Sequence, residues 1–392
     1  MKANSSPGRS PRIASIDIVR GVVMILMAID HVRVYSGLPA GGPTPGIFFT
    51  RWVTHFVAPA FVFLAGTGAY LHGRKLADRA ALSRFLFVRG AWLVLLELTF
   101  IRVCWTFNFD FAHYLLAGII WMIGICMMLM AAAIYLPIKL TGAIGIAIIA
   151  LHNLTGVFQT QLEYYFAGSE PGWLLKLLYF GGAIQFGASG PWLLILYVIV
   201  PWIGVMMAGY AFGLVMEMPQ DRRRAICLKL GIALTLLFIA LRTLNVYGDP
   251  RPWSKAHTLL GFLSTTKYPA SLQFLLMTLG PMLIFLSFAE GMRGKIAGLL
   301  ETFGRVPMFY YLLHIPLIHA AACIVSVIRE GRVDPWLFTN HPMDPGPLPP
   351  GYMWSLGLLY LVWALCIVAL YFPCRWYAGV RATRRSKWLS YI

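Results

Sequence analysis

Charge is what this sequence lacks most. Only 12% of its 392 residues are Asp, Glu, Lys or Arg, and only 15 are acidic, whereas a soluble domain averages about 25% charged residues. Hydrophobic side chains make up 59% of the chain. This composition excludes an ordinary soluble protein and predicts an integral membrane protein that crosses the bilayer several times.

Sequence motifs for metal or nucleotide binding are also absent. The chain contains no HExxH, CxxC or Walker-type loop. Its six cysteines lie in or beside apolar runs without metal-ligand spacing, and they are Cys104, Cys126, Cys227, Cys323, Cys366 and Cys374. We therefore predict no metal site and interpret the cysteines as small buried side chains. The polar, basic start and the charges inside the first apolar run also argue against a cleavable signal peptide.

The excess of positive charge has a distribution that matters more than its size. A net charge of +17 could indicate binding to nucleic acid. The basic residues, however, stand in short clusters between apolar runs, which is the pattern of cytoplasmic loops in membrane proteins. We therefore expect a lipid bilayer as partner and no nucleic acid.

Long apolar runs fix the predicted architecture. A spanning helix needs about 20 mostly apolar residues, and this length predicts a single all-α domain over residues 1–392, a polytopic integral membrane bundle of about ten transmembrane helices. The predicted spans are 13–35, 48–71, 84–106, 112–135, 138–154, 190–216, 225–245, 268–290, 300–328 and 352–376. The apolar stretch 172–187 is not counted as a span.

The loop charges orient this bundle. If the spans alternate, every large basic cluster falls on one side, which is then the cytoplasm. Both the N and C termini are predicted to be cytoplasmic, with residues 1–12 as an N-terminal tail and 377–392 as a basic C-terminal tail. The loop between residues 245 and 267 fits less well, because it is outer but carries Arg251, Lys255 and Lys267.

Ionisable residues inside the first span suggest a site. Asp17, Arg20, Met24, Met27 and His31 follow at steps of three or four residues, so they share one helix face. Charged groups are costly in a bilayer unless they face a bundle interior or a wet cavity. The alternative for Asp17 and Arg20 is a structural ion pair at a helix end.

A histidine-rich zone is predicted near the outer face. Its candidates are Asp30, His31, Arg51, His55, Glu97, Lys267, Tyr268, Tyr311 and His314. A neutral imidazole beside a carboxylate can take a proton from an attacking amine or hydroxyl. Asp30 or Glu97 is the candidate carboxylate, and either Tyr311 or Lys267 could donate to a developing oxyanion.

The same histidines also have a structural interpretation. His31 and His55 could be hydrogen-bonded core side chains. His314 and His319 flank Pro316 and could serve only a kinked helix. We rank His31 and His55 first as base and acceptor-positioning residues, with Asp30 orienting and His314 third.

A second, basic zone is predicted at the cytoplasmic face. It comprises Arg20, Arg84, Arg89 and Arg305. Arginines suit the phosphates of a nucleotide-like donor because their guanidinium groups bind phosphate in a bidentate manner. Alternatively, Arg84 and Arg89 extend only to lipid phosphates.

Five segments carry a resemblance to a known family. They are RIASIDIVRGVVMILMAIDHVR, FFTRWVTHFVAPAFVFLAGTGAYL, IIWMIGICMMLMA, STTKYPASLQFLLMTLGP and GRVPMFYYLLHIPLIH. Together they resemble the bacterial DUF1624 membrane proteins, prokaryotic relatives of heparan-alpha-glucosaminide N-acetyltransferase within the transmembrane acyltransferases. The resemblance implies a multi-pass protein of the bacterial inner membrane that takes acetyl from cytoplasmic acetyl-CoA. It also implies transfer to a sugar amine or hydroxyl on the far side, with a central histidine. One departure is that the loop Ser36–Thr50 contains no histidine, whereas the eukaryotic enzyme carries its implicated histidine in the first lumenal loop.

Three functions remain open at this point. We expect an acetyl-CoA-dependent acyltransferase whose acceptor is a glycan or another small polar molecule. Arg20, Arg84, Arg89 and Arg305 would bind the donor. Arg51, Glu97, Lys267, Tyr268 and Tyr311 would bind the acceptor. The alternatives are a proton-coupled transporter or channel for a small polar solute, in which the histidines relay protons, and a non-catalytic envelope protein. The sequence leaves open whether the chain forms a homo-oligomer.

Overall fold

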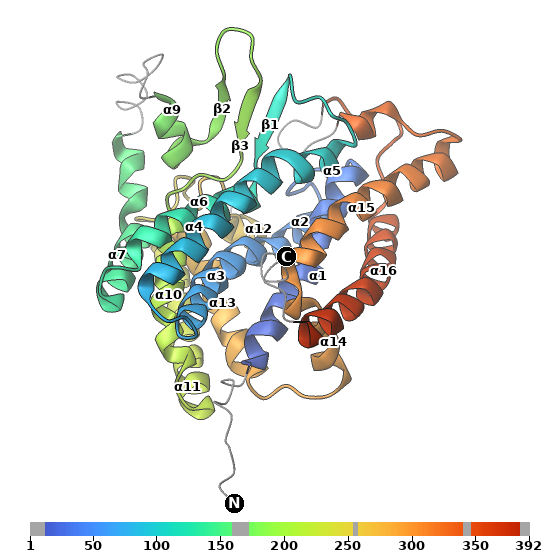
Figure 1. The fold of residues 1–392 in the computed structure, drawn as a ribbon. Helices are drawn as coiled ribbons and strands as arrows, with labels where there is room; N and C mark the ends of the chain where they lie inside the picture. The colour runs from blue at the N-terminus through green and yellow to red at the C-terminus, as the bar shows by residue number, and fades with distance from the viewer. Residues whose placement is uncertain (1–11, 159–171, 254–257, 340–345, 385–392) are drawn as a thin grey trace, which may run out of the picture.

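The computed structural model describes residues 12–158, 172–253, 258–339 and 346–384, and it shows a mostly helical protein (Figure 1). The long helices are α1 (Ala14–Ser36), α3 (Val57–Gly73), α4 (Arg79–Leu96), α6 (Ile119–Ala133), α7 (Ile138–Leu151), α10 (Trp202–Met216), α11 (Gln220–Leu244), α13 (Leu272–Ala289), α14 (Lys295–Arg305), α15 (Pro307–Glu330) and α16 (Leu356–Thr383). Each of the ten predicted spans overlaps at least one of these helices.

Short helical pieces connect the long helices. The short α-helices are α2 (Pro45–Trp52), α5 (Arg102–Thr106), α9 (Gly172–Leu175) and α12 (Leu259–Leu263). The 3₁₀ turns are η1 (Val53–Phe56), η3 (His152–Phe158) and η5 (Pro335–Phe338), and the π-helical turns are η2 (Glu97–Ile101) and η4 (Lys176–Phe180).

Six helical segments among the described residues are long and apolar enough to cross a membrane. They are Pro45–Gly73, Ile138–Gly156, Gln220–Leu244, Leu272–Ala289, Pro307–Glu330 and Leu356–Thr383. The apolar helices α6 and α10 are shorter. The helix α1 has the length of a span but contains Asp17, Arg20, Asp30 and Arg33. The chain is therefore a multi-pass membrane protein, as its composition predicts.

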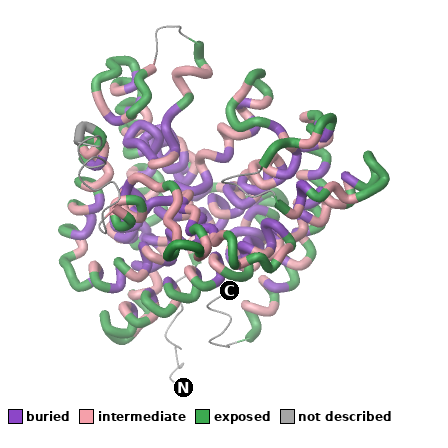
Figure 2. Tube along the Cα trace, turned by 90° about the horizontal axis from the view of Figure 1, so that it is seen from above, coloured by how far each residue is buried: buried purple, intermediate pink, exposed green. Residues whose placement is uncertain are grey.

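Burial separates the central helices from the peripheral ones. Of the 18-residue apolar stretch in α13, 78% is buried inside the protein, whereas only 17% of the corresponding stretch in α11 is buried. Buried segments gather at the centre of the tube in Figure 2, and exposed segments lie at its edge. Large apolar side chains such as Leu236, Leu365 and Phe372 are exposed on α11 and α16, which is the surface that a lipid-facing helix requires.

A small β-sheet was not predicted. Its strands are β1 (Tyr114–Ala117), β2 (Gly182–Gln185) and β3 (Trp192–Ile195), in the order β1-β3-β2. The strand β3 pairs in parallel with β1 and antiparallel with β2. Two of these four-residue strands open the runs 112–135 and 190–216, and periodicity alone does not separate a short apolar strand from the start of a buried helix. The sheet lies at one end of the bundle, and α14 lies at the other (Figure 1).

The predicted span 300–328 is interrupted near its start. Instead of one helix, α14 ends at Arg305 and α15 begins at Pro307. Between them Val306 leaves the helical region, with φ −131° and ψ 49°. The following proline explains the break, because its ring disfavours a helical conformation in the residue before it.

Glycines let α1 and α14 touch backbone to backbone. A Cβ atom on Gly304 would lie 1.8 Å from the carbonyl oxygen of Asp17, and a Cβ on Gly21 would lie 2.0 Å from that of Leu300. Neither contact tolerates a side chain. The close packing fixes α14 against the first third of α1.

This contact predicts opposite effects for two alanine substitutions in α14. Gly304→Ala should lower the thermal stability of the purified protein, by about 1–3 kcal/mol, because the methyl group overpacks a backbone contact. Gly298→Ala should raise it by about 0.5–1 kcal/mol, because a Cβ there meets nothing within 4 Å and alanine favours the helix. Melting temperatures in one detergent measure both. Equal melting temperatures for the two variants would show that the α1–α14 contact is looser than described.

Candidate functional site

A cavity of about 330 Å³ lies at the sheet end of the bundle. Leu116 of β1 and Leu196, just after β3, form part of its wall. Its polar side chains are Asp30, His31, Arg33, Arg51, Glu97, Tyr197, Tyr268 and Tyr311. A concave site with a few convergent polar groups inside an apolar bundle is the expected form of a binding or catalytic site.

A pair of histidines stands at this cavity. The His31 ring, from α1, places Nδ1 2.6 Å from Nε2 of His314, from α15. The two rings are stacked with centroids 4.8 Å apart. The Trp105 ring meets His31 edge-on at 4.9 Å, and His314 is fully buried. The sequence separates these histidines by 283 positions, and the fold brings them into direct contact.

The hydrogen bonds assign the tautomers of the two rings. Nδ1 of His314 lies 2.6 Å from the carbonyl oxygen of Tyr311, which can only accept, so this nitrogen donates its proton. When His314 is neutral, its Nε2 is then the acceptor for His31. Nδ1 of His31 consequently carries the proton, and Nε2 of His31 keeps a free lone pair. The arrangement leaves one basic nitrogen on the ring that lines the cavity.

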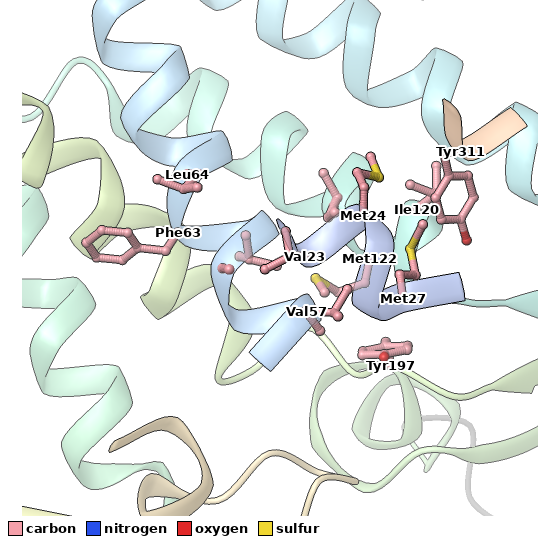
Figure 3. Packing of buried hydrophobic residues seen from close by; sticks show 14 of the residues in the cluster. Val23, Met24, Met27, Val57, Phe63, Leu64, Ile120, Met122, Tyr197 and Tyr311 are labelled. Atoms are coloured by element: carbon pink, nitrogen blue, oxygen red, sulfur yellow. The ribbon is translucent and has the colours of Figure 1, made fainter. Parts of the chain in front are cut away.

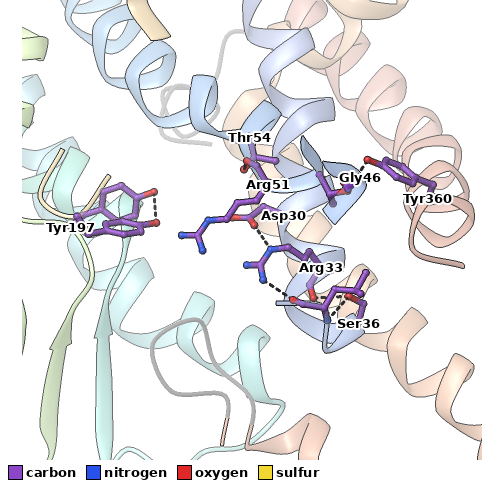
Figure 4. Close-up of polar contacts among 11 residues, drawn as sticks. Asp30, Arg33, Ser36, Gly46, Arg51, Thr54, Tyr197 and Tyr360 are labelled. Carbon is purple, nitrogen blue, oxygen red and sulfur yellow. Dashed lines mark hydrogen bonds and ion pairs between the residues drawn. The ribbon is translucent and has the colours of Figure 1, made fainter. Parts of the chain in front are cut away.

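Asp30 pairs with Arg33 and not with His31, the partner expected from the sequence. Its carboxylate pairs with Arg33, with Oδ1 and Nε 2.7 Å apart (Figure 4). Arg33 also donates to the carbonyl oxygen of Leu38. The position that orients the His31 ring is occupied by His314 rather than by Asp30.

Two cations at this end of the bundle have no hydrogen-bond or ion-pair partner among the described residues. Arg51 extends from α2 toward Tyr197 (Figure 4) and lines the cavity. Lys267 is 8% exposed, and its ammonium lies 5.2 Å from the centroid of the Tyr268 ring. The Tyr268 hydroxyl in turn donates to that of Tyr197, at 3.4 Å. Unpaired cations near a cavity favour a polar or anionic ligand.

Tyr197 is a further polar group of the cavity wall. It lies in the loop after β3 and is buried. A protonated phenol at the cavity wall can donate a hydrogen bond to a bound molecule.

Glu97 joins the cavity to the start of α6. Its Oε2 accepts hydrogen bonds from the backbone nitrogens of Ile120, at 2.9 Å, and Trp121, at 3.3 Å. It therefore caps the positive end of α6. Glu97 is also the first residue of the π-helical turn η2, and such turns often mark functional sites. A Cβ on Gly118 would lie 2.4 Å from its Oε1, so a side chain at this position would displace the carboxylate.

His55 lies outside the cavity lining. Its ring packs edge-on against Phe274, with centroids 5.4 Å apart, and its Nδ1 is buried without a hydrogen-bond partner among the described residues. The structure thus brings His31 to His314, and it leaves His55 in the surrounding shell.

The predicted cytoplasmic arginines spread over three helices. Arg20 donates to the carbonyl oxygen of Leu64, at 3.0 Å, and lies 3.9 Å from Asp17. The predicted Asp17–Arg20 pair is thus present, although Asp17 makes its closer ion pair with Arg12. Arg305 pairs with Glu301 at 2.6 Å.

The other two arginines lie on α4. Arg84 is exposed, and the guanidinium of Arg89 lies over the ring of Phe85 at 6.0 Å. None of the four predicted arginines is among the described residues that line the cavity. Over the described part of the chain, no group of three or more His, Cys, Asp or Glu side chains is placed to hold a metal ion.

Several cavity residues were given no role in the sequence analysis. Arg33 carried a usable signal, because it lies three residues after Asp30 on the same helix face. Trp105, Tyr197 and Trp336 carried none, since each is one aromatic among many in apolar surroundings.

One known protein family matches more than half of this chain. The model described as heparan-alpha-glucosaminide N-acetyltransferase, catalytic, matches residues 12–248, more than half of the chain. The chain belongs to this family. The expected resemblance to heparan-alpha-glucosaminide N-acetyltransferase is therefore confirmed, although no curated protein matches the chain.

The matched region contains only part of the site. It includes His31, Arg51 and Glu97 and ends before Lys267 and His314. The histidine pair therefore joins one ring inside the family match to one ring contributed by α15 outside it.

Proposed function

We propose that the chain is a membrane-embedded acyltransferase that moves an acetyl group from cytoplasmic acetyl-CoA to an extracytoplasmic sugar amine or hydroxyl. The observation that carries the proposal is the His31–His314 pair, which leaves a basic nitrogen at a polar cavity in a chain of this acetyltransferase family. The proposal includes about ten spans, cytoplasmic termini, the bacterial inner membrane, and the sheet end as the outer end.

His31 would act as the general base. Its Nε2 takes the proton from the acceptor amine or hydroxyl as the acceptor attacks the carbonyl carbon of the acetyl thioester. The carbon–sulfur bond then breaks, and His31 returns the proton to the leaving sulfur. Acetyl-CoA supplies the activated acetyl group.

His314 would stabilise the protonated state of His31. When Nε2 of His31 gains a proton, its Nδ1–H becomes a charge-assisted donor to Nε2 of His314. The carbonyl oxygen of Tyr311 holds His314 in the tautomer that can accept it. The two rings form a short proton relay without a carboxylate.

The remaining polar groups in and beside the cavity would bind the acceptor and the developing charge. Tyr311, Tyr197 and the ammonium of Lys267 are the candidate donors to the oxyanion. Arg51, Tyr268 and Glu97 would hold the polar groups of the acceptor, Asp30 would fix Arg33 in the wall, and His55 would support the cavity from outside. At the cytoplasmic end, Arg20, Arg84, Arg89 and Arg305 would bind the donor phosphates.

Acetyl transfer by the purified protein tests this function. The protein in detergent is incubated with radiolabelled acetyl-CoA and with glucosamine or its methyl α-glycoside. We expect labelled N-acetylated sugar to form. Failure of a folded, monodisperse preparation to label any amino sugar or sugar alcohol, together with proton-driven uptake of a polar solute into proteoliposomes, would favour the transporter instead.

Arg51 supplies a prediction about acceptor binding. Arg51→Gln should raise the KM for the acceptor about 10- to 100-fold, because a hydrogen bond to a charged group contributes about 1.5–3 kcal/mol. The value of kcat should change little. The control is Arg251→Gln, which removes an exposed arginine of an outer loop. If Arg51→Gln left the KM for the acceptor unchanged, Arg51 would not bind the acceptor.

A further inference from the structure

One tight turn, residues 266–271, carries both Lys267 and Tyr268 just before α13 begins. The Ser271 nitrogen closes it by donating to the carbonyl oxygen of Thr266 at 3.0 Å. We call this segment the site turn, because its Tyr268 lines the cavity. The conformation of the site turn sets where both side chains lie.

The contact between the site turn and the cavity wall is weak. The Tyr268 hydroxyl donates to the hydroxyl of Tyr197 at 3.4 Å, which is longer than an ordinary bond between two hydroxyl groups. Tyr197 itself belongs to the buried core that Figure 3 shows from close by. The site turn therefore depends on contacts elsewhere for its position.

Asp249, in the loop after α11, binds the donor groups of the site turn. Its Oδ2 accepts from the Thr266 nitrogen at 2.9 Å and from the Ser271 hydroxyl at 2.8 Å. Its Oδ1 accepts from the Thr266 hydroxyl at 2.8 Å. One carboxylate thus bonds both ends of the turn, and hydrogen bonds to a charged acceptor are about twice as strong as neutral ones.

His152 binds the site turn from a different part of the chain. It opens η3 at the end of α7 and is 5% exposed. Its Nε2 lies 2.9 Å from the carbonyl oxygen of Ala270. Its Nδ1 lies 3.1 and 3.0 Å from the carbonyl oxygens of Ile148 and Ile149 in α7. The ring therefore connects the site turn to the end of α7.

The contacts of His152 assign the charge of its ring. A carbonyl oxygen only accepts hydrogen bonds, so both ring nitrogens of His152 have to donate. A neutral imidazole has one N–H group, whereas the imidazolium has two. Either neutral tautomer would direct a lone pair at a carbonyl oxygen within hydrogen-bonding distance. The geometry therefore requires the imidazolium.

The groups around His152 leave the backbone as its partner. Tyr179 of η4 has its ring centroid 6.2 Å away, and the hydroxyl of Tyr247 donates to a backbone carbonyl of α7 at 2.7 Å. The helices α10 and α13, which pack against α7, contain no Asp, Glu, Lys, Arg or His. Asp249 and Lys267 are the charged groups at the site turn itself. The imidazolium has no ion pair with a carboxylate within the described ranges.

We propose that Asp249 and the imidazolium of His152 are positioning residues that hold the site turn with Lys267 and Tyr268 toward the substrate. The anion binds the donors of the turn, and the cation binds its carbonyl oxygen. Neither residue is among the described residues that line the cavity, so both act through the turn. The proposal depends on the acyltransferase function proposed above, which gives Lys267 and Tyr268 their roles.

Nitrogen NMR of histidine tests the charge of His152 without any substrate. The protein is labelled with ¹⁵N-histidine, reconstituted in liposomes at neutral pH and compared with His152→Gln. We expect the signals lost in the variant to be those of two protonated ring nitrogens. One protonated and one unprotonated nitrogen would overturn the proposal.

Hydrogen exchange measures how firmly the site turn is held, again without substrate. In Asp249→Asn, whose amide nitrogen cannot accept, peptides covering residues 264–271 should exchange about tenfold faster than in the unsubstituted protein. His152→Leu should have the same effect. His152→Gln should stay close to the unsubstituted protein, because its amide N–H can still donate to the carbonyl oxygen of Ala270. Unchanged exchange in both Asp249→Asn and His152→Leu would show that the turn holds itself.

A double-mutant cycle connects the anchoring of the turn to the reaction. Asp249→Asn alone should lower kcat/KM for acetyl transfer about 10- to 100-fold. In the Lys267→Ala/Tyr268→Phe background the same substitution should change kcat/KM by less than about threefold, because nothing remains for Asp249 to position. The control is His113→Leu, which removes an exposed histidine of the loop before β1 and should leave kcat/KM unaltered. Equal losses in both backgrounds would leave Asp249 with a role in stability alone.

The outcomes separate this proposal from the proposed function. If the unsubstituted protein transfers acetyl but His152 is neutral and the exchange of the turn is unchanged in the variants, the positioning role alone is wrong. If the protein transfers no acetyl group but the imidazolium and the faster exchange are observed, the anchoring of the site turn is supported, and only the reaction it serves is wrong.

Discussion

His31→Asn is expected to reduce acetyl transfer by about 10²- to 10⁴-fold, the usual contribution of a general base. Asparagine retains an amide N–H that can still donate to Nε2 of His314, but it offers no basic nitrogen to the acceptor. The loss should appear in kcat, with the KM values for both substrates changing by less than threefold. Steady-state kinetics with labelled acetyl-CoA measure both parameters.

The matched control for His31→Asn is His55→Asn. His55 lies outside the cavity lining, so its replacement should cost far less activity than the loss of His31. The ranking would be reversed if His55→Asn were the more damaging of the two. That result would identify His55, which packs against Phe274, as the general base. The histidine pair would then have no role in acetyl transfer.

His314→Gln is expected to lower kcat by about 10- to 100-fold. The glutamine carbonyl oxygen can still accept from Nδ1 of His31, so the ring should stay in place, but an amide cannot share the proton. The amide oxygen is a much weaker base than the imidazole nitrogen, so most of the roughly 1.5–3 kcal/mol of the charge-assisted bond is lost, which converts to this range of rates. The melting temperature should stay within a few degrees of that of the unsubstituted protein.

The test of His314 needs a variant that removes the ring contact as well. His314→Ala should lose more activity than His314→Gln, because it also frees the His31 ring. If both variants kept the original kcat, His314 would be a core residue of α15 with no part in the transfer.

Much of the fold follows from the sequence because hydrophobic length is a strong signal. Each predicted span overlaps a helix, since a bilayer leaves a chain few alternatives to the helix. The sheet could not be predicted, because four-residue apolar strands resemble helix starts. The helix break at Val306 could have been predicted, because Pro307 follows it directly in the sequence.

The site was predictable as a set of residues but not as a geometry. The sequence analysis selected His31 and His314, yet nothing in it placed α1 against α15. It assigned Asp30 to His31 because the two are adjacent, but neighbours in a helix point about 100° apart and do not face each other. Arg33, one turn away, is the partner that helical spacing favours.

Buried arginines show why an intramembrane charge alone does not define a site. Arg102 is fully buried and donates to the carbonyl oxygens of Asn108 and Asp110. Arg242 is buried in the same way and donates to backbone carbonyls of the loop that follows it. Arg51 has no such partner among the described residues. Only the structure distinguishes arginines that hold a loop from one that faces a cavity.

The sidedness of acetyl transfer tests the central claim most directly. Liposomes are loaded with labelled acetyl-CoA, the protein is reconstituted with its sheet end outward, and glucosamine is supplied outside. The account predicts labelled N-acetylglucosamine in the external solution for the unsubstituted protein, and almost none for His31→Asn at equal protein content. Equal external labelling by both proteins would contradict the account, because the transfer would then proceed without the basic nitrogen at the cavity.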